Sequence, residues 1–239
     1  HLKNENFNGK HLDLNSIKII TSTGSPLAEE SFKYVYDNIK QDVHLASIAG
    51  GTDMVGCLVL GNLYSNVYKG EIQGQSLAID IDVFTEDGKS TKDGEKGELV
   101  VKQPFPSMPV KFWGDDTGEK YHNAYFNKFK NIWHHGDFIE RTPNNGFIMR
   151  GRSDATLNPG GVRIGTSEIY QQVENIEYIT EGLVVGQDYK DDVRIILFVT
   201  TKNNQELNEE KIKSIKSKIR KNCSHKHVPS LVIRVPAIP

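Results

Sequence analysis

The sequence has few cysteines, no excess of either charge and no long apolar run. Its 239 residues include two cysteines, Cys57 and Cys223, too few for a disulfide-rich secreted scaffold or a cysteine-based zinc motif. The 29 lysines and arginines nearly balance 31 aspartates and glutamates, so general nucleic-acid or anionic-membrane binding is not expected. No apolar stretch approaches the roughly 18 residues that span a bilayer. We therefore expect a cytoplasmic globular protein without nucleic-acid or membrane partners.

Both ends lack the usual features of complete chains. The sequence starts at His1 rather than methionine, has no signal or transit peptide, and stops at Val235–Pro239 without a polar tail. We interpret it as a segment of a longer protein. At roughly 150 residues per domain, there is room for one large domain or two modest ones.

The first part of the chain reads as a strand, a loop and a helix, followed by antiparallel strands. Residues 17–22 have the β-branched enrichment of a buried strand, and Pro26 suits the first turn of the helix that follows. Apolar residues alternate over 78–83 and 97–101, which predicts two antiparallel strands. Residues 85–89 lie between these strands and are typical of a hairpin turn.

From about Ser153 the pattern changes to alternating helices and strands. Ser167 is predicted to cap one helix and Asn208 a second, while residues 193–201 and 230–235 are predicted strands. We place a domain boundary here, with residues 1–152 before it and 153–239 after it.

Two glycine-containing loops are candidates for binding a nucleotide. Gly24, Ser25 and Pro26 lie between the first strand and helix, where free backbone amides and a missing Cβ let a base or phosphate approach. In 50–53, two glycines precede Thr52 and Asp53, whose hydroxyl and carboxylate suit a phosphate oxygen and its Mg²⁺. The alternative for both loops is an ordinary turn.

A third candidate is the segment Trp133–Asp137. Adjacent residues on a strand point to opposite faces, so His134 and His135 cannot easily bind one metal ion. Asp137, placed after a glycine at a predicted strand end, is an acceptor suited to a ribose diol. A plain turn aspartate is the alternative.

The segment 151–165 is the strongest single candidate. Arg152 and Arg163 are planar donors suited to phosphates, and the segment lies at the predicted domain junction, where hinges belong. The alternative is a solvated linker. The basic helix face from Lys211 to Lys226 is interpreted as a solvated surface.

Taken in order, these segments resemble the adenylate-forming superfamily of acyl-CoA and aryl-CoA synthetases over nearly the whole chain. Within it, Lys102–Pro109, Trp133–Asp137 and Ser153–Thr166 look like the corresponding blocks of acetoacetyl-CoA synthetases. The resemblance implies an α/β fold: the C-terminal part of a large nucleotide-binding domain, with a mixed sheet and a β-rich subdomain, over 1–152. A small, incomplete α+β lid follows over 153–239, with a hinge at 153–154.

The resemblance also implies a two-step ligase. Acetoacetate and MgATP would give an acyl-adenylate and pyrophosphate, and the thiol of coenzyme A would then displace AMP. The substrates would be the small molecules acetoacetate, ATP and CoA, with Mg²⁺ as the metal.

The resemblance assigns roles residue by residue. In the first region Gly24, Ser25 and Pro26 would contact the adenine, Thr52 the α-phosphate, and Asp53 the Mg²⁺, at a position where the family usually has glutamate. Glycines at Gly50 and Gly51 would open the acid pocket.

Further positions match the ribose, the hinge and the lid. Asp137 would bind the ribose, Arg152 would lie near the ribose and phosphate, and Asp154 would be the hinge. Arg163 would meet the ATP phosphates in the first half-reaction, and Gly161 lies in the loop that approaches the active site when CoA binds.

Two family features fall outside this sequence. The phosphate-binding loop would lie upstream and the catalytic lysine just beyond Pro239, so we expect the chain alone to be inactive. The alternatives are an acetate- or propionate-activating synthetase and a non-catalytic nucleotide-binding module. The oligomeric state is not predicted by the sequence.

Overall fold

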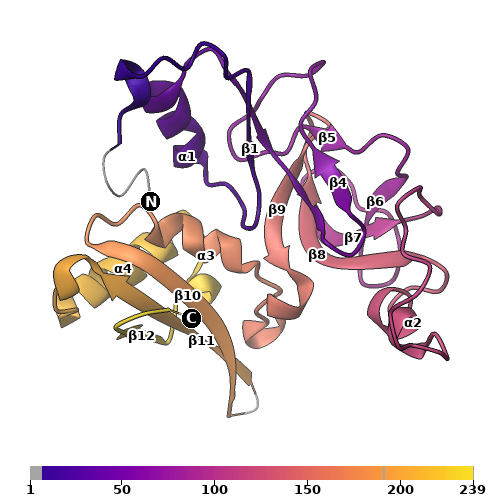
Figure 1. Ribbon diagram of the computed structural model, residues 1–239. Helices are drawn as coiled ribbons and strands as arrows, with labels where there is room; N and C mark the ends of the chain where they lie inside the picture. The colour runs from indigo at the N-terminus through magenta and orange to yellow at the C-terminus, as the bar shows by residue number, and fades with distance from the viewer. Residues whose placement is uncertain (1–6, 191, 239) are drawn as a thin grey trace. The chain divides into compact units, whose positions relative to one another are not determined.

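The computed structural model describes residues 7–190 and 192–238, and the chain divides into two compact units between Met149 and Arg150 (Figure 1). The predicted boundary, between residues 152 and 153, falls just after this division. The assignment of the units to a nucleotide-binding domain and a lid stays a prediction. Each unit is described separately below.

The first unit begins with a β-α-β arrangement. Strands β1 (Ile19–Ser22) and β2 (His44–Ser47) are parallel, and α1 (Glu29–Tyr34) with a π-helical turn (Val35–Ile39) connects them. The predicted position of Pro26 in the first helical turn is wrong, because the helix starts at Glu29 after Ala28. Pro26 instead lies in the loop that leaves β1.

Antiparallel strands make up the rest of the first unit. One sheet has the order β3 (Ala49–Gly51), β4 (Gly56–Leu60), β5 (Gly74–Gln75). The other has the order β6 (Ile81–Phe84), β7 (Lys96–Val101), β8 (Trp133–Arg141), β9 (Phe147–Arg152), with α2 (Glu119–Tyr125) before β8.

The turn predicted over 85–89 is confirmed. Thr85 N–H donates to the Lys89 carbonyl at 2.8 Å, and Gly88 N–H donates to the Thr85 carbonyl at 3.0 Å. Gly88 has φ of 78°, a conformation that glycine adopts without a Cβ penalty.

The core of the first unit is built from inward-facing residues of these strands and of the segments that connect them. Its members are large apolar side chains that exclude water: Met54, Leu58, Val59, Ile72, Ile79, Ile81, Val83, Leu99, Val101, Phe105, Trp133, Ile139 and Phe147. Both sheets contribute to it, which fixes β3 and β4 relative to β8.

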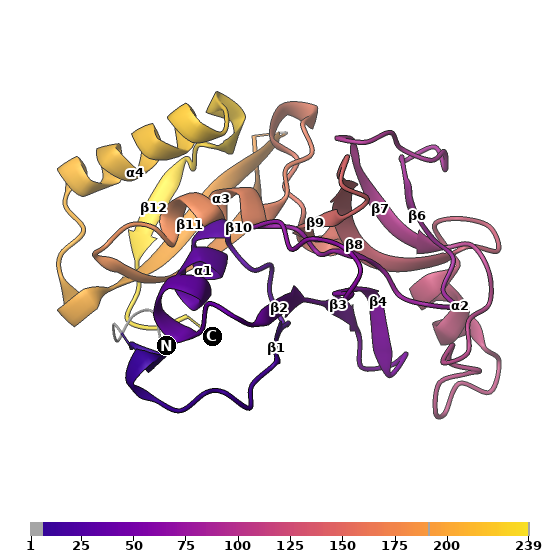
Figure 2. The same ribbon diagram turned by 90° about the horizontal axis from the view of Figure 1, so that it is seen from above.

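The second unit is a three-stranded sheet covered by two helices. The sheet order is β10 (Ile179–Tyr189), β11 (Asp192–Thr201), β12 (Leu231–Arg234); β10 and β11 are antiparallel, and β11 and β12 are parallel. Helices α3 (Thr166–Val173) and α4 (Glu209–Asn222) share one apolar core with the sheet (Figure 2). The fully buried Ile215 and Ile219 place the apolar face of α4 inward and leave its basic residues outside.

One of the two predicted caps in this unit is confirmed. Asn208 precedes α4 and its side chain accepts from Lys211 N–H at 3.0 Å. Ser167 is not a cap, because α3 starts one residue earlier, and the Glu168 carboxylate accepts from the N–H of Gly165, the cap residue, at 3.0 Å. Among the described residues no helix has the length and apolarity needed to cross a membrane.

Candidate functional site

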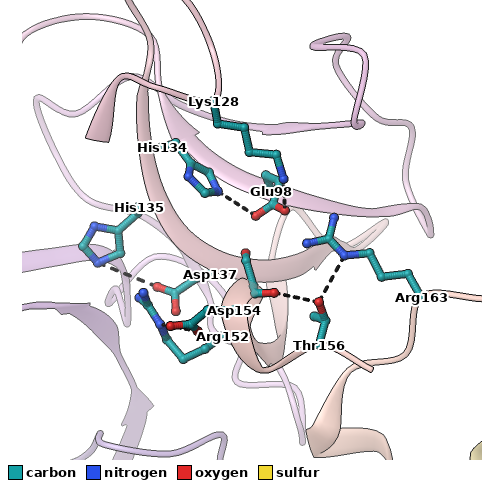
Figure 3. Close-up of polar contacts among 10 residues, drawn as sticks. Glu98, Lys128, His134, His135, Asp137, Arg152, Asp154, Thr156 and Arg163 are labelled. Carbon is teal, nitrogen blue, oxygen red and sulfur yellow. Dashed lines mark hydrogen bonds and ion pairs between the residues drawn. The ribbon is translucent and has the colours of Figure 1, made fainter. Parts of the chain in front are cut away.

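In the first unit, Asp53 and His135 lie next to Gly51, the last residue of β3. A Cβ built on Gly51 would lie 2.4 Å from Asp53 Oδ1 and 3.0 Å from His135 Cε1. His135 Nε2 in turn lies 3.7 Å from Asp137 Oδ2 (Figure 3). The fold thus brings His135, far from Gly51 in the sequence, next to both Gly51 and Asp137, and a side chain at Gly51 would displace Asp53 or His135.

Asp137 lies in the middle of β8 and not at a strand end as expected. Trp133, His135 and Asp137 are all buried, although Gly136, with φ of 82°, interrupts the regular alternation of the strand between the last two. The Asp137 side chain is 10% exposed. Because strand residues precede and follow Asp137, its mostly buried carboxylate has less conformational freedom than it would have at a strand end.

His135 is the functional candidate that the sequence reasoning missed. The Trp133 indole Nε1–H donates to His135 Nδ1 at 3.3 Å, and an indole nitrogen can only donate. The neutral imidazole therefore carries its proton on Nε2, the nitrogen that faces Asp137. The indole ring is itself fixed by stacking on Tyr125, at 3.7 Å between ring centroids. The signal in the sequence is the two-residue spacing of His135 and Asp137; the sequence analysis weighs His135 only as a metal ligand.

His134 belongs to a separate polar cluster. Its Nε2 lies 2.9 Å from Glu98 Oε2, and Lys128 Nζ lies 2.6 Å from Glu98 Oε1 (Figure 3). The Glu98 side chain is 0% exposed, so the Lys128 ammonium and the hydrogen bond with His134 offset part of the cost of burying it. Among the residues that the structure describes, no group of three or more His, Cys, Asp or Glu side chains could hold a metal ion.

Asp53 lies on an exposed turn that leaves its carboxylate accessible. Val55 N–H donates to the Thr52 carbonyl at 3.2 Å, which closes the turn. Burial, and after it the negative charge of Asp53, raises the pKa of the nearby Tyr121 phenol. Mg²⁺ is usually bound by one or two carboxylates together with substrate phosphates, so a single exposed aspartate fits this group.

Gly50 has no room for a side chain. A Cβ built there would lie 2.1 Å from the Gly56 carbonyl oxygen and 2.5 Å from Cys57 Cα, both in the backbone of β4. The missing side chain would therefore point into the β3–β4 pair. The predicted role of Gly50 in an acid pocket stays a prediction, and a large residue at this position is not a clean test of it.

The loop with Gly24, Ser25 and Pro26 is open to solvent. Gly24 has φ of 91°, and a Cβ built on it meets no atom within 4 Å. The loop connects β1 to α1, so backbone groups at the end of a parallel strand are exposed. This is compatible with the predicted adenine contact, which the geometry does not test.

The predicted residues of the second unit surround a short 3-10 turn, Ser153–Ala155. Arg152 Nε lies 3.5 Å from Asp154 Oδ1, and both side chains are exposed. Arg163 Nε donates to Thr156 Oγ1 at 3.2 Å (Figure 3). The turn and the arginine are therefore connected through Thr156.

A glycine loop, residues Pro159–Gly161, lies between Thr156 and Arg163. Gly160 and Gly161 have φ of 56° and 76°, which strains any residue with a Cβ. Gly160 N–H donates to Asp192 Oδ1 at 2.7 Å. Hydrogen bonds from the Gly160 and Val193 amides lower the pKa of Asp192. Asp192 therefore fixes the loop from β11.

Comparison with known proteins places this architecture in one class. The chain superimposes on the structure of an acetoacetyl-CoA synthetase from Streptomyces lividans with a TM-score of 0.86 and 38% identity, over 95% of this chain and 35% of the other. An anthranilate CoA ligase, AuaEII, gives a TM-score of 0.80 at 17% identity, which shows the shared fold. The fold is thus that of adenylate-forming enzymes, and the predicted α/β class is confirmed.

The sequence relatives narrow this class. The chain is 55% identical over 227 residues to an acetoacetyl-coenzyme A synthetase from Rhizobium meliloti and 45% identical over 229 residues to one from Gallus gallus. Each match covers 95% of this chain and 35% or 34% of the relative. No protein-family model matches. Over 95% of its length the chain is a homologue of acetoacetyl-CoA synthetases, and it spans about a third of the length of the curated relatives it matches.

Proposed function

We propose that this chain is part of an AMP-forming acetoacetate–CoA ligase. The observation that carries the proposal is the 55% identity to an acetoacetyl-coenzyme A synthetase over 95% of the chain. In the first step the acid carboxylate attacks the α-phosphorus of ATP and pyrophosphate leaves. In the second step the CoA thiol attacks the acyl carbonyl and AMP leaves. The two free cysteines are compatible with a reducing cytoplasm.

We assign the nucleotide to the surroundings of Asp137 and Asp53. Asp137 accepts hydrogen bonds from the ribose diol, and His135, fixed by Trp133, supports the carboxylate at 3.7 Å. Thr52 donates its hydroxyl to the α-phosphate, and Asp53 would hold Mg²⁺, which would neutralise phosphate charge when bound. The adenine contacts the loop with Gly24, Ser25 and Pro26.

The arginines of the second unit act on the phosphates. Charge accumulates on the five-coordinate α-phosphorus in the transition state, so a positioned guanidinium stabilises that state more than the ground state. Arg163 supplies this charge, and Arg152 contacts the ribose and phosphate. Asp154 is the hinge, because one small unit cannot present both a phosphate-binding and a thiol-admitting surface in one orientation. Gly161 approaches the thiol in the second step.

The test is an acid panel on the full-length ligase, following pyrophosphate and CoA thioester with acetoacetate, acetate and propionate. We expect acetoacetate to give the highest kcat/KM. A preference for acetate or propionate would assign the protein to another short-chain synthetase. ATP binding with no pyrophosphate release for any acid would assign it to a non-catalytic nucleotide-binding module.

A further inference from the structure

The loop that carries the glycines is closed at its base, independently of its tip. Leu157 N–H donates to the Ile164 carbonyl at 2.9 Å, and Ile164 N–H donates to the Leu157 carbonyl at 2.8 Å. Both side chains are buried in the core of the second unit. Thr156 directly precedes Leu157, and Arg163 directly precedes Ile164. This pair of hydrogen bonds therefore keeps Thr156 and Arg163 close together even if the conformation of the glycine loop changes.

The Thr156 hydroxyl makes two hydrogen bonds at once. It donates to the Ser153 carbonyl at 2.7 Å and accepts from Arg163 Nε at 3.2 Å (Figure 3). One hydroxyl has one donor and two acceptor lone pairs, so the two bonds do not compete. Valine has the same shape as threonine and can make neither.

The first of these bonds spans Asp154. The Ser153 carbonyl precedes Asp154 and Thr156 follows it, so rotation of the Asp154 backbone changes the distance between the bonded atoms. Thr156 N–H closes the same turn on the same carbonyl at 3.4 Å. A hinge movement at Asp154 therefore breaks the bond that fixes the Thr156 hydroxyl.

The second bond orients the guanidinium. It uses Nε of Arg163, whereas an end-on contact with a phosphate uses the two terminal nitrogens Nη1 and Nη2. The bond to Thr156 therefore restricts the side chain without occupying the atoms that would meet an anion.

We propose that Thr156 is a positioning residue that couples the hinge turn to Arg163. While the turn is closed, the hydroxyl orients Arg163 for adenylation; when the turn opens, the arginine loses this support. This inference rests on the proposed function, in which Arg163 acts in the first half-reaction.

The experiment uses Thr156→Val in the full-length ligase and measures the two half-reactions separately. Acetoacetate-dependent pyrophosphate exchange reports adenylation, and thioester formation from supplied acetoacetyl-adenylate and CoA reports the second step. Loss of one orienting hydrogen bond predicts a decrease in exchange of roughly 2- to 10-fold, with thioester formation changed less than about twofold. Thr156→Ser keeps the hydroxyl and is expected to restore exchange.

Two controls separate positioning from folding. Thr180→Val removes a hydroxyl that is 2.6 Å from Thr200 Oγ1, elsewhere in the second unit, and is expected to leave both half-reactions intact. In an Arg163→Met background, Thr156→Val is expected to cause no further loss of exchange. If Thr156→Val is too unstable to assay, Thr156→Ala is measured in the same cycle.

Three results would overturn the proposal: equal loss of both half-reactions, failure of serine to restore exchange, or additive effects of the Thr156 and Arg163 substitutions. Failure of the proposed function is distinguished from these, because the unmodified ligase would then show no acetoacetate-dependent exchange.

Discussion

Replacing Asp82 on β6 by asparagine tests how polar contacts stabilise the first unit. Its carboxylate accepts from Ser90 Oγ at 2.7 Å, Val83 N–H at 2.8 Å and Arg141 Nη2 at 2.9 Å. Asparagine removes the charge and cannot accept from Ser90 through its amide nitrogen. A hydrogen bond to a charged group contributes about 1.5 to 3 kcal/mol, so we expect Asp82→Asn to lower the free energy of unfolding by about 2 to 3 kcal/mol at pH 7.

The loss depends on pH with a defined sign. Burial by itself raises the pKa of Asp82, but the hydrogen bonds from Ser90 and Val83 and the charges of Lys102 and Arg141 outweigh it, so the pKa lies below its usual value. The stabilisation is therefore present above the unfolded pKa of about 3.9 and disappears as the pH falls through the lower folded pKa. The difference between Asp82→Asn and the parent should narrow steadily below about pH 4.

Urea unfolding of this chain, followed by tryptophan fluorescence, measures the effect. Both tryptophans, Trp113 and Trp133, precede the division at Met149, so the signal reports the first unit. The matched control is Asp80→Asn, because Asp80 pairs with Lys102 at 3.3 Å but is 48% exposed, and exposed pairs contribute about 0 to 1 kcal/mol. A loss no larger than that of the control at pH 7, or an equally large loss at pH 3, would refute the reasoning.

Further predictions concern the backbone and the site. Gly50→Ala should lower the melting temperature markedly, because the new Cβ would lie 2.1 Å from a carbonyl oxygen of β4. Gly74→Ala is the control and should change the melting temperature little, because its Cβ would lie 3.4 Å from the nearest atom; equal effects would contradict the close packing of β3 on β4. Asp137→Asn should raise the ATP KM of the full-length ligase by about tenfold, as expected for weaker binding of a diol by a neutral acceptor; an unchanged KM would remove it from the ribose site. Asp154→Pro should impair one half-reaction much more than the other, because it fixes φ at the hinge; equal losses with an intact fold would argue against a hinge.

Local signals predicted those elements that local interactions stabilise. The turn at 85–89 and the Asn208 cap each depend on residues within four positions, so their sequences were sufficient. The predicted cap at Ser167 was wrong because the helix starts at Thr166, with Gly165 as the cap residue and its amide bonded to the Glu168 carboxylate. The sequence alone did not distinguish between these neighbouring starting positions. Strand β10 was not predicted, since polar residues and two glycines, Gly182 and Gly186, interrupt its pattern. It is held by its long antiparallel pairing with β11.

The sequence alone was sufficient to identify the chemical groups and their order: the aspartates, the arginines and the glycine loops that resemble those of the adenylate-forming enzymes. The packing of distant strands placed His135 next to Gly51 and Asp137, set the Nε2 proton of the neutral His135 ring, and turned the missing side chain of Gly50 toward β4. The reason is physical. The sequence itself specifies each side chain, and local turns depend on residues close together along the chain. Contacts between β3 and β8, in contrast, depend on how distant strands pack around one core.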